Sequence, residues 1–355
     1  LDSARTLVAV FAATSYADRT DFWASLHDAF PQSHVIACSS AGEIAGDRVS
    51  DGSATAVVVR FERVALSSAA VPIQAIEMSK RAGEKLGRML APCAPRLVIV
   101  LAEGLQVHGT DLVQGIADAL PPGTAIVGGL AGDGDRFVHT WTLVDGIPRS
   151  GWVTAVALCG ALEVKSASRS GWHAFGPDRR VTRSERNVLY ELDGKPALDL
   201  YKDYLGDLAA GLPATALLFP LGLGVDGGTC VVRTVLGIDE QAKSLTFAGD
   251  VPQGTCARLM RAGHDQLIDG AARAGAEAAP GGDAPVLALA ISCVGRKLVL
   301  GERIEDEVAA TLEALPPGST QAGFYAYGEI SPSGCATCDL HNQTMTLTTL
   351  RETVA

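Results

Sequence analysis

The sequence is poor in aromatic residues, in basic residues and in long apolar runs, and each shortage disfavours a class of function. Aromatic residues make up 5% of the 355-residue chain, so few side chains could stack on the bases of single-stranded nucleic acid. Lys and Arg number 29 against 40 Asp and Glu, and the net charge of −11 disfavours binding to a phosphate backbone. No apolar run approaches the roughly 20 residues of a membrane helix, and residues 1–5 do not resemble the start of a signal peptide. We therefore expect a cytoplasmic protein that binds neither nucleic acid nor membranes.

Cysteine is too sparse for a disulfide framework. The eight cysteines are spread along the chain, and several lie within apolar segments that are predicted strands. This distribution is typical of reduced thiols in a large cytosolic protein. Hydrophobic residues, in contrast, make up 47% of the chain, which can therefore bury large cores. The length favours about two domains.

One pattern occurs three times: a strand, a helix, a proline break, and a second strand that leads into glycine and an acid. The predicted elements lie at 6–12, 21–30 and 34–39; at 96–101, 110–120 and 125–127; and at 286–291, 304–315 and 323–327. The acids are Glu43, Asp133 and Glu329. Strand–helix–strand units favour parallel pairing, which places the loops after the strands at one sheet edge, where open α/β proteins bind ligands. The acids are predicted to line related sites or one shared cleft, although glycine and an acid after a strand are also ordinary turn chemistry.

The remaining segments add antiparallel strands and further helices. Alternating patterns predict a strand pair at 55–61 and 64–73 and a meander at 137–144, 152–158 and 162–167. A long helix is predicted at 255–278. The predicted fold class is mixed α/β (α+β), with two related halves whose mixed parallel and antiparallel sheets are flanked by helices. A boundary near 171–180 gives domains at 1–172 and 173–355.

Three local patterns suggest chemistry, and each has a simpler explanation. Residues 222–227 match G-x-G-x-x-G, but a strand-like segment follows them, which favours a hairpin over a nucleotide site. Ser40 lies one glycine short of a nucleophile elbow and has no evident His partner, so a hydrolase is an alternative. Cys335, Cys338 and His341 could supply three ligands to a metal ion, or the two cysteines could act as a redox pair. The missing fourth ligand disfavours zinc.

Single histidines and arginines are further candidates. His108, His173 and His341 lie in predicted loops, where one of them could be the axial ligand of a haem. Arg233 lies in an apolar strand and Arg296 at a strand end. A buried guanidinium needs a partner, either an acid of the protein or an anionic ligand.

The chain resembles the FIST domain family, named for F-box and intracellular signal transduction. The second half carries the resemblance most clearly, in the stretches 181–184, 188–197, 232–238, 247–250, 292–296, 323–330 and 341–347. The first half resembles the family at 38–44 (CSSAGEI) and 128–133 (GGLAGD). The resemblance covers nearly the whole chain.

This resemblance implies a cytoplasmic sensory module that is not an enzyme. Such modules occur alone or beside histidine kinases, cyclic-di-nucleotide enzymes or chemotaxis proteins, and have been proposed to bind small ligands such as amino acids. One branch resembles haem proteins that sense nitric oxide and regulate kinases. The family's recurrent positions fall on Glu43, Asp133, Arg233, Arg296, Glu329 and Asn342, which the resemblance implies as ligand-binding residues.

We therefore predict a sensor that binds an amino acid or related anion in a cleft of strand-end loops. It would signal to a separate protein, such as a histidine kinase or a cyclic-di-nucleotide enzyme, in two-component-type regulation. The first alternative is a nitric oxide sensor that contains haem b and regulates such an enzyme. The second is a hydrolase that uses Ser40 or a thiol oxidoreductase that uses the cysteine pair.

Overall fold

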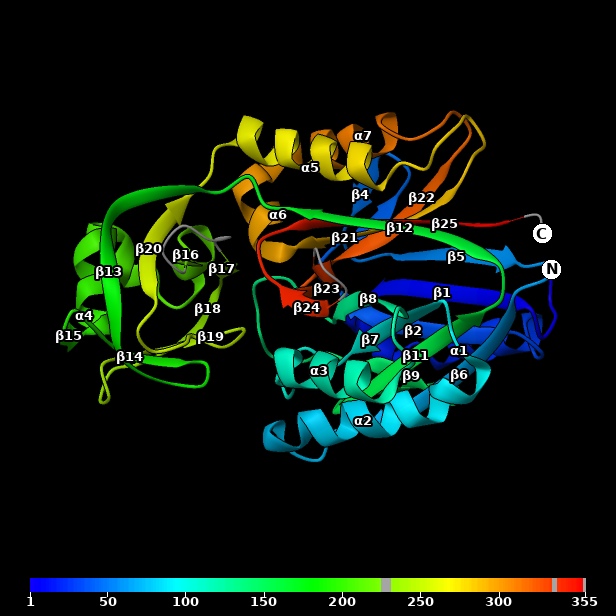
Figure 1. The fold of residues 1–355 in the computed structure, drawn as a ribbon, viewed down its shortest axis with the longest axis horizontal. Helices are drawn as coiled ribbons and strands as arrows, with labels where there is room; N and C mark the ends of the chain where they lie inside the picture. Colours follow the sequence, from blue (N-terminus) through cyan, green and yellow to red (C-terminus); the bar gives the residue numbers. More distant parts are fainter. Residues whose placement is uncertain (225–230, 334–336, 354–355) are drawn as a thin grey trace.

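The computed structural model describes residues 1–224, 231–333 and 337–353, which form a large body and a smaller lobe (Figure 1). The lobe contains residues 173–261, at the left of Figure 1, and the segments before and after it form the body. The structure is 29% helix and 42% strand, with mixed sheets. The predicted mixed α/β class is therefore confirmed.

Three parallel strand pairs lie at the centre of the body and confirm the repeated unit. These pairs are β1 (Thr6–Ala13) with β2 (His34–Ser40), β7 (Leu97–Ala102) with β8 (Ala125–Leu130), and β21 (Leu287–Cys293) with β22 (Thr320–Ala326). Their connecting helices are α1 (Thr20–Ala29), α3 (Gly109–Ala119), and α6 (Val294–Leu300) followed by α7 (Ile304–Glu313). Each pair lies in a different sheet.

Antiparallel strands extend each parallel pair into a mixed sheet. Sheet I has the order β10–β9–β2–β1–β5, with β5 (Ala54–Arg60), β9 (Thr142–Val144) and β10 (Ile147–Arg149). Sheet II has the order β24–β23–β8–β7–β11–β6, with β6 (Ala65–Pro72), β11 (Trp152–Cys159), β23 (Gly328–Ser333) and β24 (Thr337–His341). Sheet III has the order β12–β25–β21–β22–β3–β4, with β3 (Glu43–Ala45), β4 (Arg48–Ser50), β12 (Leu162–Arg169) and β25 (Met345–Glu352).

The body mixes strands from both ends of the chain. In sheet II, β23 pairs with β8, and in sheet III, β22 pairs with β3 and β25 pairs with β12. Residues 1–172 and 173–355, predicted as two domains, are therefore not separate bodies in the structure. The predicted boundary instead coincides with the point where the chain enters the lobe.

The strands of the repeated units are buried on both faces, as their apolar composition predicts. In β7, Leu97, Ile99 and Leu101 face a core that the three sheets share, while Val98 and Val100 face the layer that contains α2 (Ser79–Leu90) and α3. β1 divides its side chains in the same way between the shared core and α1. Helices α5 (His264–Ala278) and α7 pack together and cover sheet III (Figure 1). Each unit thus places one face in the common core and the other under its helices.

Three predictions from local patterns are wrong. β5 and β6 do not pair with each other, because β5 pairs with β1 and β6 with β11. The predicted meander is spread over three sheets. The segment expected as one long helix begins with strand β20 (Cys256–Arg261), and α5 starts only at His264. Alternating hydrophobicity marks a strand, but tertiary packing selects its partner.

Cys93 and Cys159 form a disulfide between the turn after α2 and the end of β11. Their Cα atoms lie 5.9 Å apart, within the range that a disulfide spans. This bond corrects the prediction that all cysteines are reduced. The two residues are 66 positions apart, and only the packing of α2 on sheet II brings them together.

The lobe is an antiparallel sheet with the order β17–β16–β20–β13–β14–β19–β18, and β15 (Lys195–Pro196) pairs with β14. The strands are β13 (His173–Glu185), β14 (Val188–Leu192), β16 (Leu221–Gly224), β17 (Val231–Arg233), β18 (Val235–Asp239) and β19 (Ser244–Phe247). Helix α4 (Ala197–Leu205) adds Tyr201 to a separate core around Phe247. The antiparallel pairing of β16 and β17 confirms the hairpin predicted for the G-x-G-x-x-G match, whose residues 225–227 lie outside the described residues.

Within the described part of the chain, no helix combines the length and the apolar character needed to cross a bilayer.

Candidate functional site

The segments that follow the second strands of the three units meet inside the body. Backbone hydrogen bonds join them, from Gly132 N–H to the Ser39 carbonyl (3.1 Å), from Tyr325 N–H to the Gly42 carbonyl (2.8 Å), and from Tyr327 N–H to the Leu130 carbonyl (3.1 Å). The ends of β2, β8 and β22 are therefore held side by side, although they belong to three sheets.

A buried acid follows each of these strand ends, and each acid closes its own loop. Glu43 accepts hydrogen bonds from the backbone N–H (3.0 Å) and the hydroxyl (2.7 Å) of Ser53. Glu329 accepts the same two bonds from Thr344, at 3.1 and 2.8 Å. Asp133 accepts three backbone N–H bonds, from residues 137–139, each 2.9 Å long. All three acids thus have partners within the protein.

The surroundings set different protonation states for the acids. Burial raises the pKa of Glu43, although its bonds to Ser53 oppose that effect. Burial also opposes ionisation of Asp133, but the hydrogen bonds from Tyr327 and from residues 137–139 hold its pKa below the usual value. Burial raises the pKa of Glu329 to about 8, against the hydrogen bonds from Thr344. Near pH 7, Asp133 is therefore ionised and most Glu329 is protonated.

Glu43 and Asp133 line one cleft of about 420 Å³. Its other walls come from residues 13–15 after β1, 40–41 after β2, 51–52 after β4, 134–136 after β8, and from α6, which follows β21. The carboxyl ends of parallel strands are the usual ligand sites of open α/β sheets. The cleft therefore has the position that the repeated unit predicts, while Glu329 is not among the residues that line it.

The cleft carries charges of both signs. The Lys297 ammonium donates to the carbonyl of Ala41 (2.8 Å) and forms an ion pair with Asp51. The Arg136 guanidinium donates to the Thr14 hydroxyl (3.1 Å), and its Nε lies 3.9 Å from Asp133. A zwitterion could therefore find partners for both of its charges here.

Lys297 was not among the predicted binding residues, whereas its neighbour Arg296 was. Consecutive residues of a helix point about 100° apart, so only one of the two can face the cleft. Arg296 faces the core, where it donates to Glu307 (2.6 Å), to the Leu267 carbonyl (2.8 Å) and to the Ser170 carbonyl. Its partners are all within the protein, which corrects the expectation that it holds an anionic ligand.

Arg233, Glu329 and Asn342 lie away from the cleft, on segments that meet where the lobe joins the body. Arg233, in lobe strand β17, donates to the carbonyls of Leu340 (3.1 Å) and Asp250 (3.3 Å). Asn342 follows β24 of the body, and its amide atoms have no hydrogen-bond partner among the described residues. The six predicted ligand-binding residues therefore fall in three places: the cleft, the core and the junction.

The three candidate haem ligands differ in their surroundings. His108 caps α3 through Nδ1, and its Nε2 lies 3.2 Å from Asp250. His173 is exposed at the start of β13. His341 keeps a buried Nε2 that has no partner in the described part of the chain, and burial lowers the pKa of its imidazole, which favours the neutral form that ligates iron. Of the three histidines, only His341 could therefore ligate a haem iron without losing an existing contact and without placing the haem at the surface.

The remaining chemical candidates are not assembled into a site. The Ser40 hydroxyl donates to the carbonyl of Gly42 (2.6 Å) and accepts from its N–H (2.8 Å), so it stabilises a turn. Burial raises the pKa of the Cys338 thiol in β24, and Cys335 lies outside the described residues. Within the described ranges, no group of three or more His, Cys, Asp or Glu could hold a metal ion.

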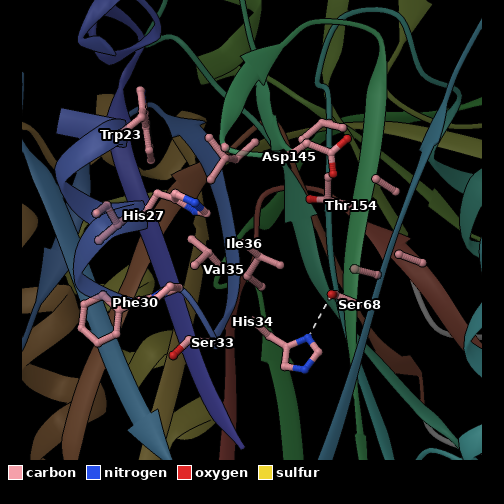
Figure 2. A pocket seen from close by; sticks show the side chains of 18 residues that line it. Trp23, His27, Phe30, Ser33, His34, Val35, Ile36, Ser68, Asp145 and Thr154 are labelled. Atoms are coloured by element: carbon pink, nitrogen blue, oxygen red, sulfur yellow. Dashed lines mark hydrogen bonds between the residues drawn. The ribbon is translucent and has the colours of Figure 1, made fainter. Parts of the chain in front are cut away.

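A second cavity, of about 470 Å³, is an open groove that the sequence analysis did not anticipate. Figure 2 shows Trp23 and His27 of α1 and Phe30 just after it on one side, and Ser68 of β6 and Thr154 of β11 on the other. A hydrogen bond of 2.9 Å between His34 and Ser68 crosses it (Figure 2). Sheets I and II approach each other here, and no local pattern marks such a contact between sheets.

Together these features define a mixed α/β protein with a charged cleft at its strand ends. Comparison with known families identifies residues 6–195 as a FIST N domain and residues 197–332 as a FIST C domain. The chain belongs to the FIST family. FIST domains are sensory domains, which fits a role in signalling and a protein that is not an enzyme.

Three relatives, all named only as uncharacterized proteins, share part of the sequence. Proteins of Mycobacterium tuberculosis and Mycobacterium bovis are each 29% identical over 222 residues, which are 59% of this chain and 56% of each relative. A protein of Methanocaldococcus jannaschii is 25% identical over 253 residues, which are 65% of this chain and 49% of the relative. The chain thus spans about half the length of the curated relatives it matches.

Proposed function

We propose that this protein is a sensor that binds an amino acid or a related small anion in the strand-end cleft. The observation that supports this most directly is the meeting of strand ends from all three repeated units around one cleft that contains Lys297 and Arg136 together with Asp51 and Asp133. Its volume of about 420 Å³ suits a small ligand.

The charges of the cleft favour a zwitterion over a simple anion. A ligand carboxylate would bind near Lys297, whose ammonium is partly buried and whose present acidic partner, Asp51, is exposed. The exposed partner can turn away into water, whereas Lys297 stays at the cleft because it also donates to the carbonyl of Ala41. A ligand ammonium would then pair with Asp51 or Asp135.

Binding would be reported to a separate signalling protein, such as a histidine kinase or a cyclic-di-nucleotide enzyme. The sensory character of the family supports this part of the proposal. The segments that line the cleft also carry the backbone bonds between the three sheets, so a ligand there could shift the sheets relative to one another.

Thermal unfolding in the presence of single amino acids and small carboxylates tests the proposal. At least one of these compounds should raise the Tm of the native protein, and Lys297→Met should remove most of that increase. The matched control is Lys195→Met, an exposed lysine of the lobe, which should leave the increase unchanged. An unchanged Tm with the whole panel, or an equal increase in both variants, would contradict the proposal.

A haem-based nitric oxide sensor is the second candidate, and it rests on His341 Nε2, which has no hydrogen-bond partner within residues 1–224, 231–333 and 337–353. Titration of the purified protein with haem b should then give a Soret band that His341→Ala removes and His173→Ala retains. A spectrum that stays that of free haem excludes this candidate.

A further inference from the structure

The junction between lobe and body holds an unusual concentration of unsatisfied polar atoms. Ten buried side-chain nitrogen and oxygen atoms have no hydrogen-bond partner among the described residues. Two of them, His108 Nε2 and Asp250 Oδ1, lie 3.2 Å from each other and can pair. Apart from these two and Trp172 Nε1, the atoms belong to segments at or beside this junction, in Thr110, Thr234, Glu329, His341, Asn342 and Gln343. Each such atom costs free energy in a folded protein, so a concentration of them points to a missing partner.

Contacts between the two parts show that these segments share one place. The side-chain amide of Gln343 donates to the carbonyl of Leu217 in the lobe (3.0 Å), and Arg233 of the lobe donates to the carbonyl of Leu340 in the body (3.1 Å). A Cβ atom at Gly249 of the lobe would lie 2.9 Å from Arg233 Nε and 3.3 Å from the Thr110 hydroxyl of the body. The glycine thus lets the two surfaces approach closely.

Most of the unpartnered groups at the junction are uncharged near neutral pH. Asn342, Gln343 and the threonine hydroxyls are always neutral. Burial keeps Glu329 protonated and favours the neutral form of His341. The buried cation Arg233 faces the charges of Asp250 and Asp339. The charged groups thus already face charges of opposite sign, and the donors and acceptors that remain are neutral ones, which an uncharged ligand could satisfy.

Asn342 indicates the kind of ligand most clearly. The residue is 1% exposed, and both its amide oxygen and its amide nitrogen lack partners among the described residues. A side-chain amide with both atoms free can form two parallel hydrogen bonds with a group that presents a donor beside an acceptor. Amides, lactams and nucleobases have such an edge.

The connection between the two parts allows the junction to open. The chain enters the lobe through the start of β13 and leaves it through the end of β20, and His173 and Arg261 are paired neighbours there. Figure 1 shows these two strands running side by side from the body into the lobe. A two-stranded link of this kind can act as a hinge.

We propose that the junction is a second binding site, distinct from the cleft, for an uncharged small molecule with adjacent hydrogen-bond donors and acceptors. The lobe would move about the paired strands to admit the ligand and would close on it. The site combines Asn342 and Thr110 of the body with Arg233 and Thr234 of the lobe.

The test is thermal unfolding of the full chain with nicotinamide, uracil and adenine as probes. At least one probe should raise the Tm of the native protein, and Asn342→Leu should abolish that rise. Without any probe, Asn342→Leu should itself raise the Tm by about 2 °C or more, because it removes an unpaired buried amide without leaving a cavity. Lys297→Met, in the separate cleft, should keep the full response to the probe, so failure of the cleft proposal and failure of this one are distinguishable.

Two outcomes overturn the proposal. The first is a Tm that no probe raises, or a rise that survives in Asn342→Leu. The second is a lower Tm for Asn342→Leu without any probe, which would show that the amide already has partners within the protein. If Asn342→Leu does not fold, Thr110→Val replaces it in the test, because valine has nearly the shape of threonine and lacks the hydroxyl. If the probe raises the Tm of Thr110→Val as much as that of the native protein, the proposal is overturned.

Discussion

The buried carboxyl of Glu329 makes the stability of this protein depend on pH in an unusual direction. Its Oε2 accepts both hydrogen bonds from Thr344, and its Oε1 has no partner among the described residues. Glutamine at this position can keep both Thr344 bonds on its oxygen and places an uncharged NH2 group where the protonated carboxyl carries its OH. Glu329→Gln therefore mimics the protonated carboxyl of Glu329 at every pH.

The size of the effect follows from the pKa of Glu329, which burial raises from 4.5 to about 8 in the folded protein. The folded state binds the proton more tightly than the unfolded state, so this contribution is fully present below pH 4.5 and is lost as the pH rises through about 8. At 1.36 kcal/mol per pH unit, the loss is roughly 3 kcal/mol at neutral pH and roughly 5 kcal/mol above the folded pKa. The glutamine variant does not undergo this loss.

Urea unfolding near pH 5, 7 and 9 measures the prediction. The variant should have nearly the stability of the native protein at about pH 5, and should exceed it by roughly 3 kcal/mol at about pH 7 and by more at about pH 9. Glu313→Gln, an exposed carboxylate on α7, is the matched control and should show no such trend. A constant difference between Glu329→Gln and the native protein across this range would refute the reasoning.

Three further substitutions test other parts of the structure. Tyr327→Phe keeps the ring stacked on its neighbour but removes the hydroxyl that donates to Asp133, and urea unfolding should show a loss of about 1–3 kcal/mol. Gly323→Ala should prevent folding, seen as insoluble expression or lost near-UV circular dichroism, because its Cβ would lie 1.6 Å from the carbonyl oxygen of Ala290. Cys93→Ser removes a crosslink between residues 66 positions apart and should cost about 4 kcal/mol under oxidising conditions.

Each of these has a control within the same protein. Gly281→Ala should be neutral, since nothing lies within 4 Å of its Cβ position. In the presence of a reductant, the native protein should have the same free energy of unfolding as Cys93→Ser. If the reductant leaves the free energy of unfolding of the native protein unchanged, the disulfide does not contribute to stability. Acid unfolding tests the role of Asp133. Because the pKa of Asp133 is lowered in the folded protein, its contribution to stability is lost as the pH falls below 3.8. Tyr327→Phe removes one cause of the lowered pKa and should move this loss to higher pH.

The repeated unit was predictable because its signals are short-range. Buried strands, the helices between them and the glycine–acid exits were all read from segments of fewer than 50 residues. Right-handed parallel pairing within such a unit follows from chain geometry alone. The positions of Glu43 and Asp133 in one cleft follow from this geometry together with the bonds between strand ends.

The partners of the other site residues were not predictable in the same way. Arg296 and Lys297 are adjacent in the sequence, and only the packing of α6 on the core decides which of them faces the cleft. Arg233 was predicted to need a partner, but its carbonyl acceptor on Leu340 lies 107 positions away. The groove at Trp23 and the disulfide at Cys159 arise where sheets or helices meet, which no local pattern marks.

The sequence by itself determined the mixed α/β class, the three parallel units, the buried strands and the acids at the strand ends. These depend on hydrophobic periodicity and on the handedness of short connections, both of which act within a few tens of residues. Only the tertiary structure decided that the three units lie in three sheets, that residues 173–261 form a lobe, and that unsatisfied polar groups gather where this lobe meets the body. Those features depend on which distant faces pack together, and that choice is made by the complementarity of whole surfaces, which no single segment encodes.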